Sequence, residues 1–223
     1  MSTSALLAEE LAPHLYKTTL DNGLTVLVKE MEGTRVATVQ IWVKAGSVYE
    51  NKGEAGITHF IEHMIFKGTE TRGPGELAGA IEGAGGQINA YTSFEYTVYH
   101  ATLSAEHWEM AFEVLAEAVM HSVFDPVELE REKKVVLEEY SMRYDRPSTR
   151  LFQDLMATAY TRHPYRLPVI GNEETINNYS RDMVLNYIEN HYYPQNMTVV
   201  VAGEHGLYQA PDFACLPQGG TSL

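Results

Sequence analysis

The sequence predicts an α+β fold, in which a mostly antiparallel sheet carries helices packed on one face. Two observations predict this class. Short runs of apolar and β-branched residues and longer segments of helical periodicity follow one another as strands, helices, strands, helices and a final strand, without regular βαβ alternation. A hydrophobic content of 44% in 223 residues is enough for a sizeable core.

Six segments are expected to be strands. Asp21-Asn22-Gly23 separates the first two and is a hairpin turn signal. The last is a continuous apolar run, which is typical of a buried strand. The expected strands are residues 15–20, 24–29, 36–44, 87–91, 95–103 and 197–202.

Six further segments are expected to be helices. Asp125 followed by Pro126 is a helix start, because Pro is favoured at the first helical position. Ser180 is a suitable N-cap for the last helix, because its hydroxyl can accept a hydrogen bond from an amide of the first turn. The expected helices are residues 57–67, 76–82, 106–121, 126–145, 149–161 and 180–191.

We expect one domain over residues 15–204, preceded by a lead-in at 1–14 that is frayed or forms a short helix. Residues 205–223 contain two Pro and three Gly and show no periodicity, so we expect an irregular tail there. The single cysteine, Cys215, excludes an intramolecular disulfide and gives no sign of a thiolate metal cluster.

The segment that indicates a function reads His59-x-x-Glu62-His63, and no Pro or Gly interrupts it. On a helix, which turns about 100° per residue, both imidazoles and the carboxylate lie on one face. The opposite face is apolar and suits the core; it carries Ile57, Phe60, Ile61, Met64 and Ile65.

Two imidazoles one helical turn apart can bind the same zinc ion. Glu62 lies beside them and is suited to take a proton from a zinc-activated water. The order is the inverse of the commoner His-Glu-x-x-His motif and is the one found in inverzincins.

A catalytic zinc needs a third protein ligand. The acidic helix expected at 126–145 offers several carboxylates, and most acids in such a run are solvated or paired with Lys and Arg. Glu132 and Glu139 are two turns apart and share a face, whereas Glu138 points about 100° away from Glu139. Periodicity does not choose among the three.

Several separate motifs, in matching order and spacing, resemble the N-terminal domain of pitrilysin-type zinc peptidases, the family of insulin-degrading enzyme and the mitochondrial processing peptidases. The resemblance runs from about Tyr16 to Gly203. It is carried by Asp21-Asn22-Gly23-Leu24, Gly46-Ser47, Gly53-Glu54-Ala55-Gly56, His59-Phe60-Ile61-Glu62-His63-Met64, Phe66-Lys67-Gly68-Thr69, Asn89-Ala90-Tyr91-Thr92, Glu132 to Glu139, and Tyr193-Pro194-Gln195-Asn196-Met197.

This resemblance implies one zinc ion per chain, held by His59, His63 and Glu139. It implies that Glu62 is the general base of a zinc metallo-endopeptidase, which would hydrolyse peptides or small unfolded proteins. Glu132 matches an acid of the family that is expected to orient a ligand.

The resemblance also implies that substrate pairs as an extended strand along the segment Asn89, Ala90, Tyr91 and Thr92. From the residues alone, an ordinary interior strand is the competing interpretation of this segment.

The family continues after the position of Gly203 into a second domain of similar fold, which closes a chamber over the zinc. Residues 205–223 do not resemble that continuation. We therefore expect a natural truncation, a frameshifted end or a fragment of the family's two-domain chain, and the sequence does not choose among them. The alternative function is that of a weakly active or inactive family member that binds zinc and peptide or a partner subunit. A second copy or another subunit would then supply the missing half.

The net charge of −14 argues against nucleic acid as a partner, because phosphate binding needs clustered Lys and Arg. It favours basic or extended peptides. No run of 18 apolar residues is present, so no membrane span is expected. Residues 1–10 lack the features of a signal or transit peptide, which leads us to expect a cytoplasmic location.

Overall fold

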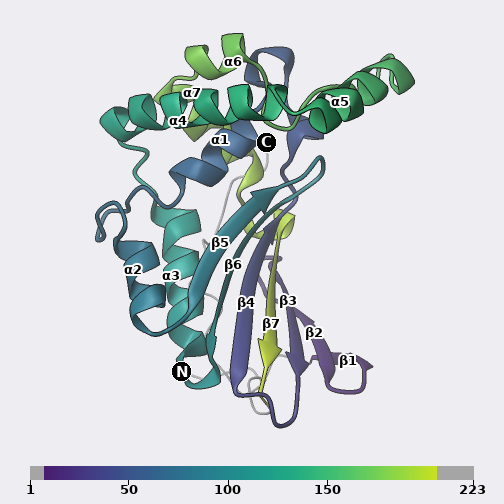
Figure 1. Ribbon diagram of the computed structural model, residues 1–223. Helices are drawn as coiled ribbons and strands as arrows, with labels where there is room; N and C mark the ends of the chain where they lie inside the picture. Colours follow the sequence, from purple (N-terminus) through teal and green to yellow (C-terminus); the bar gives the residue numbers. More distant parts are fainter. Residues whose placement is uncertain (1–7, 205–223) are drawn as a thin grey trace.

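The computed structural model describes residues 8–204 (Figure 1). Their strands form one sheet in the order β1-β2-β3-β7-β4-β6-β5. Neighbouring strands are antiparallel except β3 and β7, which are parallel. The strands are β1 (Glu9–Ala12), β2 (Leu15–Thr19), β3 (Thr25–Glu30), β4 (Val36–Val43), β5 (Gln87–Thr92), β6 (Thr97–Ser104) and β7 (Met197–Gly203).

The described residues also contain α1 (Ile57–Met64), α2 (Glu76–Gly83), α3 (Trp108–His121), α4 (Pro126–Tyr144), α5 (Pro147–Ala159), α6 (Glu173–Asn178) and α7 (Arg181–His191). Short 3-10 helices span Ser47–Tyr49, Lys52–Glu54, Ala105–His107, Pro164–Arg166 and Pro194–Asn196. None of the described helices is both long enough and apolar enough to cross a membrane.

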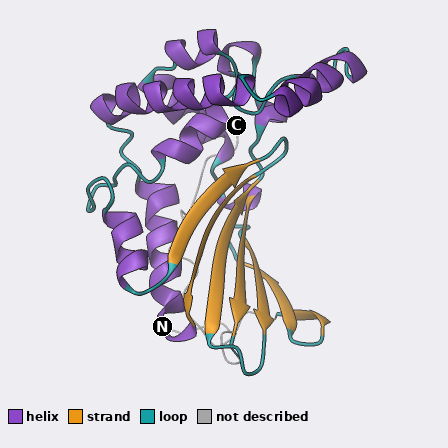
Figure 2. Cartoon of the chain, viewed as in Figure 1, coloured by secondary structure: helices purple, strands orange, loops and turns teal. Residues whose placement is uncertain are grey.

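The helices and the sheet form the two layers of an α+β fold, as predicted (Figure 2). Side chains of β3, β4 and β7 alternate between fully buried and partly exposed, which is the pattern of a sheet with one face on the core. Helix α3 packs along β4 and β6, and α1 and α2 pack against β5. Helix α4 lies across the end of the sheet, with α1 between it and the strands (Figure 1).

Three expectations are corrected. Residues 9–12, expected in a frayed or helical lead-in, form strand β1, which pairs with β2 at the edge of the sheet. Helix α6 was not expected, and Asn172 caps it by accepting from the Thr175 amide at 3.0 Å. The strand expected at 95–103 begins at Thr97, because residues 93–96 close the turn through Ser93 N–H and Tyr96 O.

Other local expectations are confirmed. The turn at 21–23 closes with Gly23 N–H donating to Leu20 O at 2.8 Å, and Gly23 has a φ of +85° that favours glycine. Asp125 caps α4 by accepting from the amides of Val127 and Glu128. The tail expected at 205–223 lies outside the described residues.

Candidate metal centre

Helix α1 has a buried apolar face and a polar face, and the polar face carries two of the candidate ligands. Phe60, Ile61 and Met64 are fully buried in the hydrophobic core. On the other face the rings of His59 and His63 lie 4.8 Å apart between centroids. The amphipathic pattern therefore fixes the rotation of α1, and with it the direction of both imidazoles.

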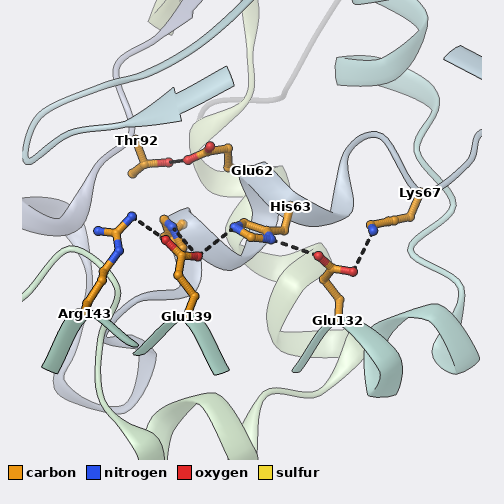
Figure 3. A network of polar contacts seen from close by, with 8 residues as sticks. Glu62, His63, Lys67, Thr92, Glu132, Glu139 and Arg143 are labelled. Atoms are coloured by element: carbon orange, nitrogen blue, oxygen red, sulfur yellow. Dashed lines mark hydrogen bonds and ion pairs between the residues drawn. The ribbon is translucent and has the colours of Figure 1, made fainter. Parts of the chain in front are cut away.

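Helix α4 brings a carboxylate to these imidazoles (Figure 3). Glu139 Oε2 is 3.6 Å from His59 Nε2 and 3.4 Å from His63 Nε2. Glu138, the adjacent acid, is exposed. Among the described residues, His59, His63 and Glu139 form the one group of three such donors able to share a metal ion.

The donors suit zinc in both chemistry and spacing. Two imidazoles and one carboxylate are the ligand types of a catalytic zinc site, which keeps a fourth position open. Donors on a tetrahedral zinc, at bonds of about 2.0 Å, are separated by roughly 3.3 Å. The separations of 3.4 and 3.6 Å from Glu139 Oε2 to the two imidazole nitrogens are close to that value, and all three donors lie within 4.8 Å of one another.

Glu132 lies on the far side of His63. Its Oε1 is 2.9 Å from His63 Nδ1, and its Oε2 is 2.7 Å from Lys67 Nζ (Figure 3). Burial raises the pKa of Glu132, but the contacts with His63 and Lys67 outweigh it and hold that pKa below its usual value. An ionised Glu132 fixes the tautomer of His63 with Nδ1 protonated and Nε2 directed at Glu139.

Glu139 is also ionised over the physiological range. The hydrogen bond with His63 lowers its pKa to about 2, against burial, and His59 and Arg143 add to the effect. Arg143 Nη2 lies 2.5 Å from Glu139 Oε1, the oxygen that does not face the imidazoles. Arg143 therefore holds the carboxylate in orientation and leaves Oε2 for a metal.

Glu62 is held separately, by strand β5. Thr92 Oγ1 donates to Glu62 Oε2 at 2.5 Å. Thr97 Oγ1 lies 3.5 Å from Thr92 Oγ1 and donates to Ala45 O at 2.9 Å. Burial raises the pKa of Glu62, and the Thr92 hydrogen bond offsets this only in part. A carboxylate with a raised pKa is suited to proton transfer near neutral pH.

The expected substrate segment lies at the edge of the sheet beside this carboxylate. Strand β5 pairs with β6 on one side only within the described residues. Asn89 and Tyr91 are exposed, whereas Ala90 and Thr92 are partly buried. The side chain of Thr92 is directed at Glu62, so one strand contributes both an open edge and a contact to the expected base.

Three residues near the centre were not singled out from the sequence. Arg143 follows Glu139 by four residues on α4, a spacing that places the pair on one helix face and could have revealed it. Lys67 lies beyond the end of α1 and pairs with Glu132 of α4, which no spacing in the sequence indicates. Glu50 lies in the loop before α1 and binds its amino end. No periodicity points to Glu50.

Comparison with known proteins gives the family. The family model described as insulinase, peptidase family M16, matches residues 25–173, most of the chain. The chain belongs to the M16 peptidases.

M16 relatives with curated names support this assignment. An uncharacterized zinc protease of Bacillus subtilis is 38% identical over 185 residues, which cover 83% of this chain and 45% of that protein. The mitochondrial-processing peptidase subunit beta of Rattus norvegicus is 38% identical over 191 residues, covering 86% and 39%. The chain thus spans less than half the length of these M16 proteins.

Solved structures show the same M16 fold. A protease from Helicobacter pylori superposes with a TM-score of 0.82 at 30% identity, covering 90% of this chain and 47% of that one. The periplasmic protease PqqL from Escherichia coli gives 0.86 at 24% identity and covers 96% and 25%, a likeness in fold alone.

Proposed function

We propose that this chain carries the catalytic centre of a zinc-dependent metallo-endopeptidase. The observation that carries the proposal is the convergence of two imidazoles from α1 and one carboxylate from α4, with Glu62 on the same helix face. The family and the relatives named zinc proteases support it.

His59, His63 and Glu139 would hold one zinc ion per chain. Zinc bound there supplies a water of lowered pKa and a positive charge that polarises the peptide carbonyl. Arg143 and Glu132 keep two of the three ligands oriented by contacts to atoms that do not face the metal position.

Glu62 would act as general base. Its Oε2 accepts from Thr92, so Oε1 is the atom available to take a proton from the attacking water. Once protonated, Glu62 would return the proton to the leaving amine. Its raised pKa reduces the cost of holding the proton between the two steps.

The substrate would be a peptide or a small unfolded protein, bound as an extended strand along Asn89, Ala90, Tyr91 and Thr92. An unpaired strand edge gives affinity through main-chain hydrogen bonds, largely independent of sequence. The net charge of −14 favours basic peptides. We keep a cytoplasmic location as a prediction, testable by fractionation of the native cells.

A second candidate function is binding without efficient turnover. The chain covers 45% of the Bacillus relative, so the activity of that whole protein does not carry over to this chain. The chain would then bind zinc and peptide, and a second copy or a partner subunit would supply what turnover needs. The rat relative carries the name of a subunit.

One experiment separates these functions. Cleavage of a quenched fluorescent, basic, unstructured peptide is measured together with zinc content for wild type, Glu62→Gln and chelator-treated protein. We expect about one zinc in wild type and in Glu62→Gln, with cleavage only in untreated wild type and a loss of at least about 10³-fold in the variant.

Each outcome has a distinct meaning. One zinc without cleavage in wild type favours the second function. Unchanged cleavage in Glu62→Gln refutes the role of Glu62, and a chain without zinc refutes the metal centre.

A further inference from the structure

The amino end of α1 lacks a capping side chain of its own. Its N-cap is Gly56, with a φ of +89°, and a Cβ there would lie 2.3 Å from Ile170 O. A glycine is therefore required by both the backbone conformation and the close approach. The first amides of this eight-residue helix must find acceptors elsewhere.

Glu50 provides these acceptors from the preceding loop. Its Oε2 accepts from Gly56 N at 2.7 Å, and its Oε1 accepts from Thr58 N at 3.0 Å and from Thr58 Oγ1 at 2.7 Å. Both oxygens are engaged, and a carboxylate at this end also complements the helix dipole.

This cap is tied to α7 and α6. The hydroxyls of Thr58 and Tyr187 are 2.9 Å apart and buried. Immediately before the helix, Ala55 O accepts from Thr175 Oγ1 at 2.7 Å and from Tyr179 OH at 2.6 Å. Three side chains distant in sequence, those of Tyr187, Thr175 and Tyr179, thus hydrogen-bond to the amino end of α1 and the residue before it.

The same region also contacts the helix that carries the third expected ligand. Lys133 of α4 is buried and donates to Asn177 O of α6 at 3.3 Å and to Glu130 at 2.7 Å. Helix α6 therefore links α1, with two imidazoles and the base, to α4, with the carboxylate.

From this arrangement we infer that Glu50 is a positioning residue of the metal centre, acting through the amino end of α1 to set His59 and His63 against Glu139. The inference rests on the proposed function, since it concerns the same metal. Donors from two separate helices must meet within a few tenths of an ångström. A loosened α1 could slide or rotate and would separate them.

The partial burial of Glu50 disfavours the charged form of its carboxyl. It raises the pKa of this carboxyl to about 7, although the donors of Gly56 and Thr58 lower it. Groups with strongly shifted pKa values are concentrated at functional sites.

Glu54, in the same loop, is the matched control. It is partly exposed, as Glu50 is, but caps only the short turn at Lys52–Glu54, through Asn51. Replacing either acid by glutamine removes the charge with little change of size. The two variants therefore differ only in which contacts the original carboxylate made.

Zinc affinity is measured by competition with a chromophoric chelator for wild type, Glu50→Gln and Glu54→Gln. The visible spectrum of the Co²⁺-loaded chain is recorded alongside. We expect Glu50→Gln to bind zinc at least tenfold more weakly, with altered Co²⁺ bands, and Glu54→Gln to stay within twofold with unchanged bands. Wild-type affinity and spectrum in Glu50→Gln would overturn the inference and leave the proposed function intact.

A wild-type chain that binds no zinc would refute the metal centre and this inference together. If Glu50→Gln lacks the native far-ultraviolet circular dichroism, the decision passes to Thr58. Thr58→Val keeps the shape but removes the hydroxyl that Glu50 accepts from, and Thr58→Ser restores it. We expect weaker zinc binding in Thr58→Val than in Thr58→Ser; equal affinities would overturn the inference.

Discussion

His59 and His63 stand one turn apart on α1, yet their surroundings differ. His59 is 4% exposed, and its Nδ1 has no hydrogen-bond partner among residues 8–204. His63 is more exposed, and its Nδ1 is paired with Glu132 at 2.9 Å. One imidazole is oriented by packing and the other by a carboxylate.

Their pKa values move in opposite directions as a result. Burial, with a contribution from the charge of His63, lowers the pKa of His59 to about 4. Burial also acts to lower the pKa of His63, but Glu132 and Glu139 outweigh it and raise that pKa to about 9. In the metal-free chain at neutral pH, His59 is neutral and His63 is protonated. A metal would therefore displace one proton, from His63.

The largest effect is expected when either His59 or His63 is removed. His59→Ala and His63→Ala should each weaken zinc binding by at least about 10³-fold, because each removes one of three ligands. His59→Ala should also lower the free energy of unfolding of the chelated chain by about 2 kcal/mol, since it opens a cavity in buried surroundings. Metal competition and urea unfolding measure the two.

His100→Ala, on β6 and outside the metal group, is the control and should retain wild-type zinc affinity. Retained zinc in His59→Ala would show that this imidazole is not a ligand.

The pH dependence of the chelated chain separates the two imidazoles. The pKa of His63 is raised in the folded state, so its stabilisation is complete below pH 6.5 and is lost as the pH rises to about 9. The loss is at most roughly 3 kcal/mol, and less after allowance for solvent. Urea unfolding from pH 6.5 to 9 checks it, and His63→Gln should flatten the alkaline limb.

His59 has the opposite sign, because its folded pKa lies below the usual value. Its contribution is present above pH 6.5 and is lost as the pH falls toward 4. An alkaline limb that persists in His63→Gln would contradict the comparison.

A smaller effect is expected from Glu132→Gln. It removes the ionised acceptor of His63 Nδ1 but no ligand, so zinc affinity should fall about 10- to 100-fold. Glu138→Gln, an exposed neighbour on α4, should leave it unchanged. Equal affinities of the two variants would mean that packing alone orients His63 as it does His59.

The smallest effect is expected from Lys67→Met. The Lys67 side chain is 35% exposed, so its ion pair with Glu132 is screened by solvent. Zinc affinity should fall less than about tenfold, and less still in high salt. Lys134→Met, on the exposed side of α4, is the control. A larger loss of zinc affinity in Lys67→Met than in Glu132→Gln would mean that Lys67 contributes more to the metal centre than Glu132 does.

The sequence predicted most of the elements, because their signals are local. The Asn22-Gly23 turn, the Asp125 cap and the apolar face of α1 need no distant contact. Strand β1 was missed because all four residues are exposed and show no alternation. Helix α6 was missed because its six residues are mostly polar, with two of them buried.

The carboxylates on α4 show where local signals end. Periodicity did not choose among Glu132, Glu138 and Glu139, and the family resemblance singled out Glu139. The packing of α4 on α1 gives the contacts that separate the three. Glu139 faces the two Nε2 atoms, Glu132 faces one Nδ1, and Glu138 faces solvent. Glu50 depends on a loop folding back onto a helix, for which no spacing rule exists.

Among residues 8–204 the outer edge of β5 has no strand partner, which has a consequence for the chain's colloidal behaviour. A strand edge that accepts an extended peptide accepts any unpaired strand, including β5 of another copy. Natural edges are often protected by Lys, Pro or a bulge, yet Gln87–Thr92 contains neither residue and pairs in regular register. Concentrated protein should therefore self-associate through this edge, and a tightly bound peptide should keep it dispersed.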